Sequence, residues 1–418
     1  MSRVRRRVEG LYVLGFDKEV GELTEDAVQS AVEGAFSSDF VFRSPRRVGG
    51  KEVTDVLVLF GDVALVIQAK AQSSRDRDPI AWATKNLKKA LKQTSGAIRT
   101  LRSGRVTHVA NARRGTIPFD ASEFRYMYGL VVLHHRSSPY LASELVPSAA
   151  GVGFPLHVLS FRDFFNLASF LDTPWDLVQY LEHRTDVLIP TLEPKVHQEQ
   201  DVFAYYASGY EEIYALRAKA RGDSFTAEDA RPSGEFLRGV LAGNVDPSAG
   251  RLVDLLIDRV HDVDPDLEPV DVPGSLPVRQ GTAEYAKIAA ALASIPRVRR
   301  VALGRRAIAM ASRAAQTGDT RHFLTYNPRR DDCLLYMVSA LSKKRRTERR
   351  EYLVYLTTLA KAYCGVYRAI GIATTAPGSG GGAEDYVLIE CPQPEPSEEV
   401  LRLGRVEFGE LKHRLLDS

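Results

Sequence analysis

The chain has few cysteines, and none has a spacing that would give it a recognised function. Among its 418 residues only Cys333, Cys364 and Cys391 occur, without a CxxC pair or a nearby histidine pair of zinc-site type. We therefore expect reduced thiols in a protein core, and neither a disulfide framework nor a zinc centre.

Long uncharged apolar runs are also missing. No stretch approaches the ~18 apolar residues that suggest a transmembrane helix. The start, MSRVRRRVEG, is positively charged but lacks the apolar segment of a secretion signal. These two features predict a cytoplasmic protein that does not enter membranes.

Several common catalytic signatures are absent from the sequence. There is no GxSxG elbow, no catalytic cysteine signature and no GxGxxG fingerprint, and the glycines at 378–382 are not followed by Lys-Ser/Thr. Acyl transfer, dinucleotide redox chemistry and a phosphate-binding P-loop are therefore not favoured.

What the sequence does contain is typical of a globular protein with two or three domains. It is 44% hydrophobic and 26% charged, with a formal net charge of +3 that says nothing by itself about nucleic acid. Short apolar runs alternate with helical patterns over residues 1–188, which predicts an α/β domain with a mixed central sheet flanked by helices. A first strand is expected at Tyr12 to Gly15, and Thr24 is expected to cap a helix that runs to about Phe36. Residues 161–184 are expected to form two helices broken at Thr173-Pro174.

The polar stretch from Pro190 to Gln200 marks a domain boundary, and residues 189–320 are predicted to be mainly helical, interrupted by a loop from Asp262 to Pro277. Residues 321–418 are predicted to form a small α+β domain with a recognition or regulatory role, in which a helix to about Ala362 is followed by strands at Val366 to Thr374 and Tyr386 to Glu390.

The most informative segment is KEVTDVLVLFGDVALVIQAKAQ, residues 51–72. It reads as two apolar strands joined by Gly61-Asp62, a two-residue hairpin turn. If Phe60 pairs with Val63, Asp55 lies opposite Gln68, and directly opposed residues share a face with Cβ atoms ~4.5–5.5 Å apart. Lys70 is two positions after Gln68 and shares that face. An acid, an amide and an amine are therefore expected to converge.

Two interpretations of this convergence are open. Because the strands are apolar on both faces, burying an acid and an amine there is costly unless they have partners or a bound ion, which favours a functional site. The alternative is a structural salt bridge between Asp55 and Lys70 at the edge of the sheet, with Gln68 as a spectator.

Asp55, the twelve residues that follow it and Gln68-Ala69-Lys70 resemble the PD-(D/E)XK nucleases, especially the Mrr-type restriction endonucleases, some of which carry QxK. By its pattern of elements the resemblance extends over about residues 8–185, and it implies a restriction-endonuclease-like fold. The preceding helix resembles theirs too. Its Glu25 matches a position where many of these enzymes place an additional metal-binding carboxylate, and Glu33 is an alternative.

The resemblance implies a Mg²⁺-dependent hydrolysis of phosphodiester bonds, with Mn²⁺ as a substitute metal. Asp55, Gln68 and Glu25 would hold the ion, the Ala69 carbonyl could add a ligand, and Lys70 would act on the attacking water or the scissile phosphate. An amide at Gln68 in place of a carboxylate leaves the site one negative charge short. Metal affinity and rate are therefore expected to be reduced.

Two basic segments could bind nucleic acid. Residues 79–119 contain nine Lys or Arg and no Asp or Glu. On a helix from about 80 to 102, four lysines form one stripe that Arg99 extends, and Gln93 is a further candidate contact. The four lysines are Lys85, Lys88, Lys89 and Lys92. The second segment, Lys343 to Arg350, could bind nucleic acid or an acidic partner, and both segments could instead be solvated surfaces.

Three functional hypotheses follow. The first is a metal-dependent nuclease acting on DNA, in restriction, defence against foreign DNA, or repair. The second is a nuclease-fold protein without turnover that binds nucleic acid or regulates. The third places the function in the C-terminal half, which would act as an interaction or regulatory region by forming a homo-oligomer or binding a protein partner. Fold analogy alone does not choose among them.

Overall fold

The computed structural model of this chain describes two compact units, and each is considered by itself. One comprises Met1–Pro247 and Ala293–Arg297, and the other Ser248–Leu292 and Val298–Ser418. The described residues are 20–72, 78–135, 154–171, 173–184, 199, 203, 206, 247–260, 282–327, 331–339, 345–376, 384–392 and 395–409. The strand expected at Tyr12 to Gly15, the boundary near Pro190 to Gln200 and the loop from Asp262 to Pro277 lie outside them. The division into three domains stays a prediction.

The first unit is built on a five-stranded mixed sheet with the strand order β1-β2-β3-β6-β7. The β1, β2 and β3 strands are antiparallel to one another, whereas β3, β6 and β7 run parallel. The strands are β1 (Val41–Arg43), β2 (Val56–Phe60), β3 (Val63–Gln72), β6 (Tyr126–His135) and β7 (Leu156–Ser160). The predicted mixed sheet is confirmed.

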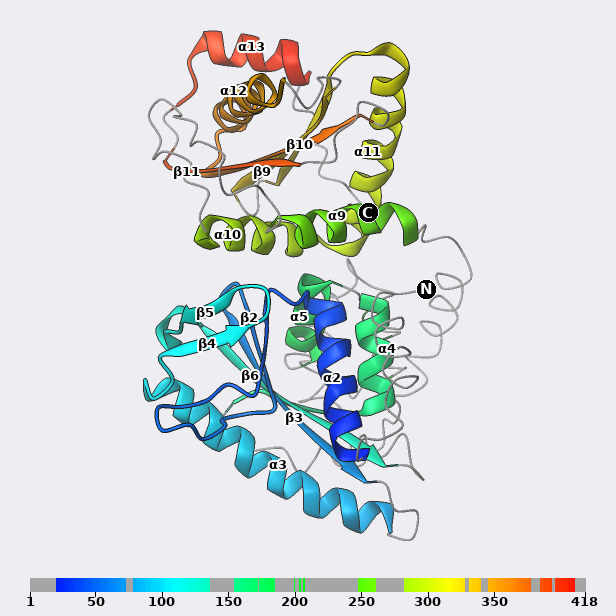
Figure 1. The fold of residues 1–418 in the computed structure, drawn as a ribbon, viewed down its shortest axis with the longest axis vertical. Helices are drawn as coiled ribbons and strands as arrows, with labels where there is room; N and C mark the ends of the chain where they lie inside the picture. The colour runs from blue at the N-terminus through cyan, green and yellow to red at the C-terminus, as the bar shows by residue number, and fades with distance from the viewer. Residues whose placement is uncertain are drawn as a thin grey trace, which may run out of the picture. The chain divides into compact units, whose positions relative to one another are not determined.

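Helices cover both faces of this sheet (Figure 1). They are α2 (Val20–Phe36), α3 (Pro79–Arg102), α4 (Phe161–Leu171) and α5 (Pro174–His183). The α3 helix lies on one face, whereas α2 and α4 pack on the other. The sheet is therefore the middle layer of three, as expected for strands that are apolar on both faces.

The β2–β3 hairpin has the register that its turn predicts. Phe60 pairs with Val63 and Val56 with Ile67. Gly61 adopts a positive φ of 58°, which glycine tolerates at no steric cost. The two-residue turn therefore fixes which side chains of the two strands share a face.

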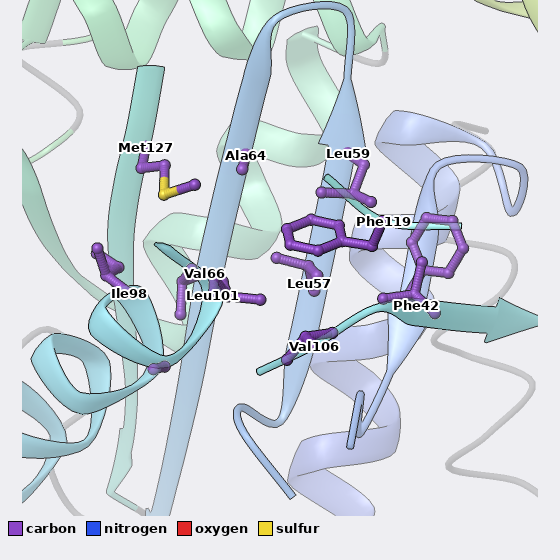
Figure 2. Close-up of a cluster of buried hydrophobic side chains, with 12 residues drawn as sticks. Phe42, Leu57, Leu59, Ala64, Val66, Ile98, Leu101, Val106, Phe119 and Met127 are labelled. Carbon is purple, nitrogen blue, oxygen red and sulfur yellow. The ribbon is translucent and has the colours of Figure 1, made fainter. Parts of the chain in front are cut away.

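Alternation along the hairpin directs one set of apolar residues to the face covered by α3. Leu57 and Leu59 of β2 and Ala64 and Val66 of β3 belong to one buried cluster with Leu101 of α3 (Figure 2). Val131 and Leu133 of β6 pack under the earlier part of α3. Because Gln68 and Lys70 continue the alternation of β3 beyond Val66, they extend this face toward the end of the hairpin, whereas Asp55 lies just outside β2.

The helix boundaries follow local signals in most places. Asp78 caps α3, its carboxylate accepting from the Ile80 N–H at 3.0 Å, and Pro79 occupies the first turn. The break expected at Thr173-Pro174 separates α4 from α5, with Thr173 as the cap of α5.

Two expectations about this unit were wrong or incomplete. Thr24 does not cap α2, because the helix already begins one turn earlier, at Val20; a cap is worth only about 1 kcal/mol and is easily overridden. A short hairpin after α3 was not predicted, since its exposed and partly polar strands carry little periodicity. It consists of β4 (His108–Asn111) and β5 (Gly115–Pro118), followed by a 3₁₀ turn, η1 (Ala121–Glu123).

The second unit contains a four-stranded mixed sheet with the order β11-β10-β9-β8. Within it β9 and β10 are parallel and are connected through α12, whose inner residues Leu353 and Leu356 pack with Leu335 and Met337 of β9. Its strands are β8 (Arg321–Asn327), β9 (Asp332–Ser339), β10 (Arg368–Thr375) and β11 (Asp385–Glu390). Its helices are α9 (Pro247–Arg259), α10 (Thr282–Ala293), α11 (Arg297–Thr317), α12 (Arg346–Cys364) and α13 (Glu398–Phe408). The helix to about Ala362 and the two strands after it were predicted; β8, β9 and α13 were not.

In the described part of the chain, every helix is too short or too polar to cross a lipid bilayer.

Candidate functional site

Asp55 lies where β2 separates from β3. The main-chain pairing of the two strands ends at Val56 and Ile67. Beyond that point the Asp55 carboxylate accepts the next outward N–H of β3, that of Ala69, with Oδ2 at 2.7 Å. The main-chain carbonyl of Asp55 accepts from Ser44 at 2.9 Å. The acid is therefore anchored to both neighbouring strand segments.

Three oxygen atoms surround the ammonium group of Lys70. Its Nζ donates to the Ala69 carbonyl at 2.8 Å and to Gln68 Oε1 at 3.4 Å. Asp55 Oδ2 lies 3.6 Å away, within ion-pair range. A carboxylate, an amide and a main-chain carbonyl thus converge on one positive charge. We call Asp55, Gln68 and Lys70 the hairpin site.

Thr54 fixes the orientation of the Gln68 amide. Its hydroxyl donates to the Ile67 carbonyl at 2.7 Å and accepts from Gln68 Nε2 at 3.0 Å. A hydroxyl has a single hydrogen, and because that of Thr54 is hydrogen-bonded to the Ile67 carbonyl, its oxygen can only accept a hydrogen bond from the Gln68 amide. Gln68 therefore presents its oxygen, rather than its nitrogen, to Lys70.

The members of the hairpin site differ in burial. Gln68 is 2% exposed, whereas the side chains of Asp55 and Lys70 keep 17% and 15% exposure. Within the described residues, the hydrogen bond and ion pair of the Asp55 side chain both use Oδ2. Its second oxygen is thus available to a ligand that reaches the end of the hairpin.

The predicted Glu25 lies on α2, but its side chain is outside the described residues and its role as a ligand stays a prediction. The neighbouring Asp26 forms an ion pair with Arg43 at 2.7 Å. Arg43 pairs with Val56 in the sheet, one residue from Asp55. This part of α2 therefore reaches the same end of the sheet as the hairpin site, but from the face opposite to the one that Gln68 and Lys70 extend. Glu33 accepts instead from Gln29 at 2.7 Å.

The predicted nucleic-acid contacts on α3 lie on its solvent side. Its buried face packs on the sheet, and the α3 basic stripe is the exposed set Lys85, Lys88, Lys89, Lys92 and Arg99. Gln93 is also exposed. Among the described residues no ion pair joins this stripe to an acid. The stripe flanks the hairpin site on a neighbouring element but does not converge on it.

The second basic run is used differently from what its composition suggested. Lys343 and Lys344 lie outside the described residues. Arg349 is 3% exposed, and both it and Arg346 bind the buried carboxylate of Asp385. At these two arginines the solvated-helix interpretation is wrong.

Two residues of the site region were not singled out from the sequence, Thr54 and Asp26. A single threonine beside an aspartate gives no signal of its role, which depends on strand pairing. Asp26 is adjacent to the predicted Glu25, and its pairing with Arg43 was not foreseeable without the sheet. Among the described residues no group of three His, Cys, Asp or Glu side chains is placed to hold a metal.

Comparisons with protein-family models, with curated proteins and with solved structures gave no match to this chain.

Proposed function

We propose that the first unit is a metal-dependent nuclease with a restriction-endonuclease-like fold that hydrolyses phosphodiester bonds of DNA. The observation that carries this proposal is the convergence of three oxygens, from Asp55, Gln68 and Ala69, on the single positive charge of Lys70. The resemblance of the segment from Asp55 to Lys70 to PD-(D/E)XK nucleases supplies the chemistry.

The donor atoms of the hairpin site fit a hard divalent cation. Carboxylate, amide and main-chain carbonyl oxygens are the ligand types that Mg²⁺ and Mn²⁺ accept, with water completing the shell. Asp55, Gln68 and the Ala69 carbonyl would hold such an ion, and Glu25 could add a second carboxylate. When bound, the ion would activate a water molecule and neutralise charge on the phosphate.

The chain's own residues would perform the remaining tasks. The Ala69 N–H holds the Asp55 carboxylate in place, and Thr54 keeps the Gln68 oxygen turned toward the site. Lys70 would orient the attacking water or offset negative charge that develops on the phosphate. The α3 basic stripe would bind the phosphate backbone next to the site, which favours a polyanionic substrate.

A second candidate is a nuclease-fold protein that binds nucleic acid without cleaving it. Two observations favour it. Gln68 stands where a metal-binding acid would add charge, and Lys70 pairs directly with Asp55 at 3.6 Å. A metal-independent salt bridge is itself a stable arrangement for these two groups.

Cleavage assays separate the two candidates. Plasmid, linear duplex, single-stranded DNA and RNA are incubated with the full chain and Mg²⁺ or Mn²⁺. We expect metal-dependent cleavage of DNA that is lost in Asp55→Ala and in Lys70→Ala. Asp62→Ala and Lys51→Ala are matched controls, because both residues are exposed and lie outside the hairpin site. Cleavage that survives at Asp55→Ala and Lys70→Ala would refute the assignment of the site.

A binding assay tests the role of the α3 basic stripe. In the variant Lys88→Glu/Lys89→Glu/Lys92→Glu, the dependence of DNA affinity on salt should become shallower, because fewer counterions are released. An unchanged slope would leave the stripe as a solvated surface. DNA binding without cleavage, unaffected by Asp55→Ala and Lys70→Ala, would favour the binding module.

A further inference from the structure

The α11 helix of the second unit is basic along its whole length. It contains Arg297, Arg299, Arg300, Arg305, Arg306 and Arg313, and no aspartate or glutamate. Its inner side is mostly apolar and also holds Arg300: Val301 and Ala307 are buried, and Val301 approaches Gly250 of α9. Three of the six arginines, Arg305, Arg306 and Arg313, are exposed on the opposite side of the helix.

We define the α11 outer face as the exposed residues Arg305, Arg306, Ala309, Ser312, Arg313 and Gln316. Their spacing of three and four residues places them on one side of the helix. Arginine and glutamine thus alternate with alanine and serine. The short side chains allow the helix backbone to come close to a partner, while the long ones reach beyond it.

Two of the three arginines on this face, Arg305 and Arg313, have no acid partner within the described parts of the chain. Arg300, on the inner side, forms an ion pair with Asp254 at 2.6 Å. By contrast, Arg305 and Arg313 are exposed and their charge is available to a partner. Arg306 lies over the ring of Phe323 at 4.5 Å, a cation–π contact that orients its guanidinium.

We infer that the α11 outer face is a contact surface for duplex DNA. Charge complementarity favours a polyanion, since the face carries three arginines and no acid. A helix about 10–12 Å across fits the B-form major groove, which is about 12 Å wide. Arginine and glutamine are also side chains that bind base edges in that groove.

The composition of the face distinguishes duplex DNA from other nucleic acids. Single-stranded DNA and RNA are bound largely by stacking of bases on aromatic side chains, and the α11 outer face has none. In duplex RNA the major groove is too narrow to admit a helix. Duplex DNA is therefore the partner that this surface fits best.

This inference concerns binding by the second unit and does not depend on catalysis at the hairpin site. If the proposed nuclease function also holds, α11 gives the enzyme a second duplex contact. If cleavage is never observed, the contact is still expected. A binding readout therefore keeps the two conclusions separate.

The test measures duplex affinity of the full chain against salt concentration, with a 30-base-pair duplex and no divalent metal. Each arginine that contacts a phosphate contributes about one to the slope of log K against log salt. The variant Arg305→Gln/Arg313→Gln should therefore lower the slope by about two and weaken binding at low salt. Glutamine is chosen because it supports helix formation about as well as arginine.

The matched control is Arg402→Gln/Arg405→Gln on α13. These arginines are also exposed, belong to the same unit and remove the same charge. The control should leave the slope nearly unchanged. Equal effects of the two double variants would overturn the inference, because they would indicate net charge alone. So would a duplex RNA that competes as well as duplex DNA of the same length.

Discussion

Each unit places a carboxylate beside basic side chains at the end of a sheet, yet the two carboxylates are satisfied to different degrees. In the second unit Asp385 is 0% exposed and accepts from Arg346 Nε at 2.9 Å and Arg349 Nε at 2.7 Å. Arg349 also donates to Thr375 at 2.6 Å. Both oxygens of this acid are in use.

In the first unit Asp55 is partly exposed and has one main-chain donor and one lysine. The lysine is 3.6 Å away, further than a hydrogen bond, and divides its contacts among three oxygens. Both contacts of the Asp55 side chain among the described residues use the same oxygen. The second carboxylate oxygen of Asp55 can therefore act as a ligand to a cation.

The difference separates a structural ion pair from a site that can take a ligand. A buried acid with both oxygens bound by guanidinium groups has no capacity for another cation, and removing either partner leaves a buried charge. An acid with an accessible oxygen near other oxygens can exchange its lysine for an ion. Burial and the number of satisfied carboxylate oxygens therefore distinguish the two cases together.

The largest expected effect is on folding of the second unit. Asp385→Asn removes the negative partner of the buried Arg349 and of the partly exposed Arg346, and should cost about 3–5 kcal/mol. Hydrogen exchange in peptides from α12 and β11 measures this loss of stability. Tryptophan fluorescence would not report on it, because both tryptophans, Trp82 and Trp175, belong to the first unit.

The substitution Asp55→Asn in the first unit should cost no more than about 1 kcal/mol, measured by tryptophan fluorescence during urea unfolding. Similar costs at the two sites would remove the distinction between them.

A third carboxylate sharpens the comparison through its pH dependence. Asp163 accepts from the Ser160 hydroxyl at 2.6 Å rather than from a guanidinium. Burial raises its pKa to about 6 from the ordinary value of 3.8. Because the folded state binds this proton more tightly, the contribution of Asp163 to stability is full below about pH 3.8 and is lost as pH rises through about 6.

Urea unfolding of the wild type and of Asp163→Asn at several pH values measures this contribution. The stability of the wild type relative to the variant should rise on going from pH 7 to pH 4, by on the order of 1–3 kcal/mol. A difference that is constant over this range would mean that Asp163 does not titrate as its burial implies.

Local patterns in the sequence were sufficient for the core of the first unit. The Gly61-Asp62 turn predicted the hairpin register, which the structure confirms from Phe60–Val63 to Val56–Ile67. The position of Asp55 opposite Gln68 lies beyond this paired region. The Thr173-Pro174 dipeptide gave the helix break. These features depend on neighbouring residues, which is why a single sequence reveals them.

Features that join distant residues could not be predicted. The run from Lys343 to Arg350 gives no sign that two of its arginines bind Asp385, 36 residues after Arg349. Likewise, the position of Thr54 next to Gln68 exists only once β2 and β3 are paired. The metal and the reaction remain predictions, because the donor atoms define a possible ligand without defining its chemistry.

Restoring the missing charge should strengthen cation binding at the hairpin site. Gln68→Glu adds a carboxylate beside Asp55, and ligand charge is one of the determinants of metal affinity. We expect Mn²⁺ to bind about tenfold more tightly, or by about 1.4 kcal/mol, in calorimetric titration. Gln316→Glu is the matched control, since Gln316 is exposed and belongs to the second unit. No gain at Gln68→Glu, or an equal gain in both variants, would argue against a metal site here.

The smallest expected effect concerns Thr54, which we regard as a positioning residue. Thr54→Val keeps the shape of the side chain and removes the hydroxyl that accepts from Gln68 Nε2 at 3.0 Å. A hydrogen bond of this kind contributes about 0.5–1.5 kcal/mol, so the Mn²⁺ concentration at half-saturation should rise by a factor of roughly 2 to 10.

A double-mutant cycle distinguishes positioning from a general loss of stability. In a Gln68→Ala background, Thr54→Val should no longer change the Mn²⁺ titration, because the amide that it orients is gone. Its cost in urea unfolding should remain, since the hydroxyl also donates to the Ile67 carbonyl at 2.7 Å. Additive effects on metal binding would show that Thr54 acts through the hairpin backbone, and the orientation of Gln68 would then have to be set by Lys70 alone.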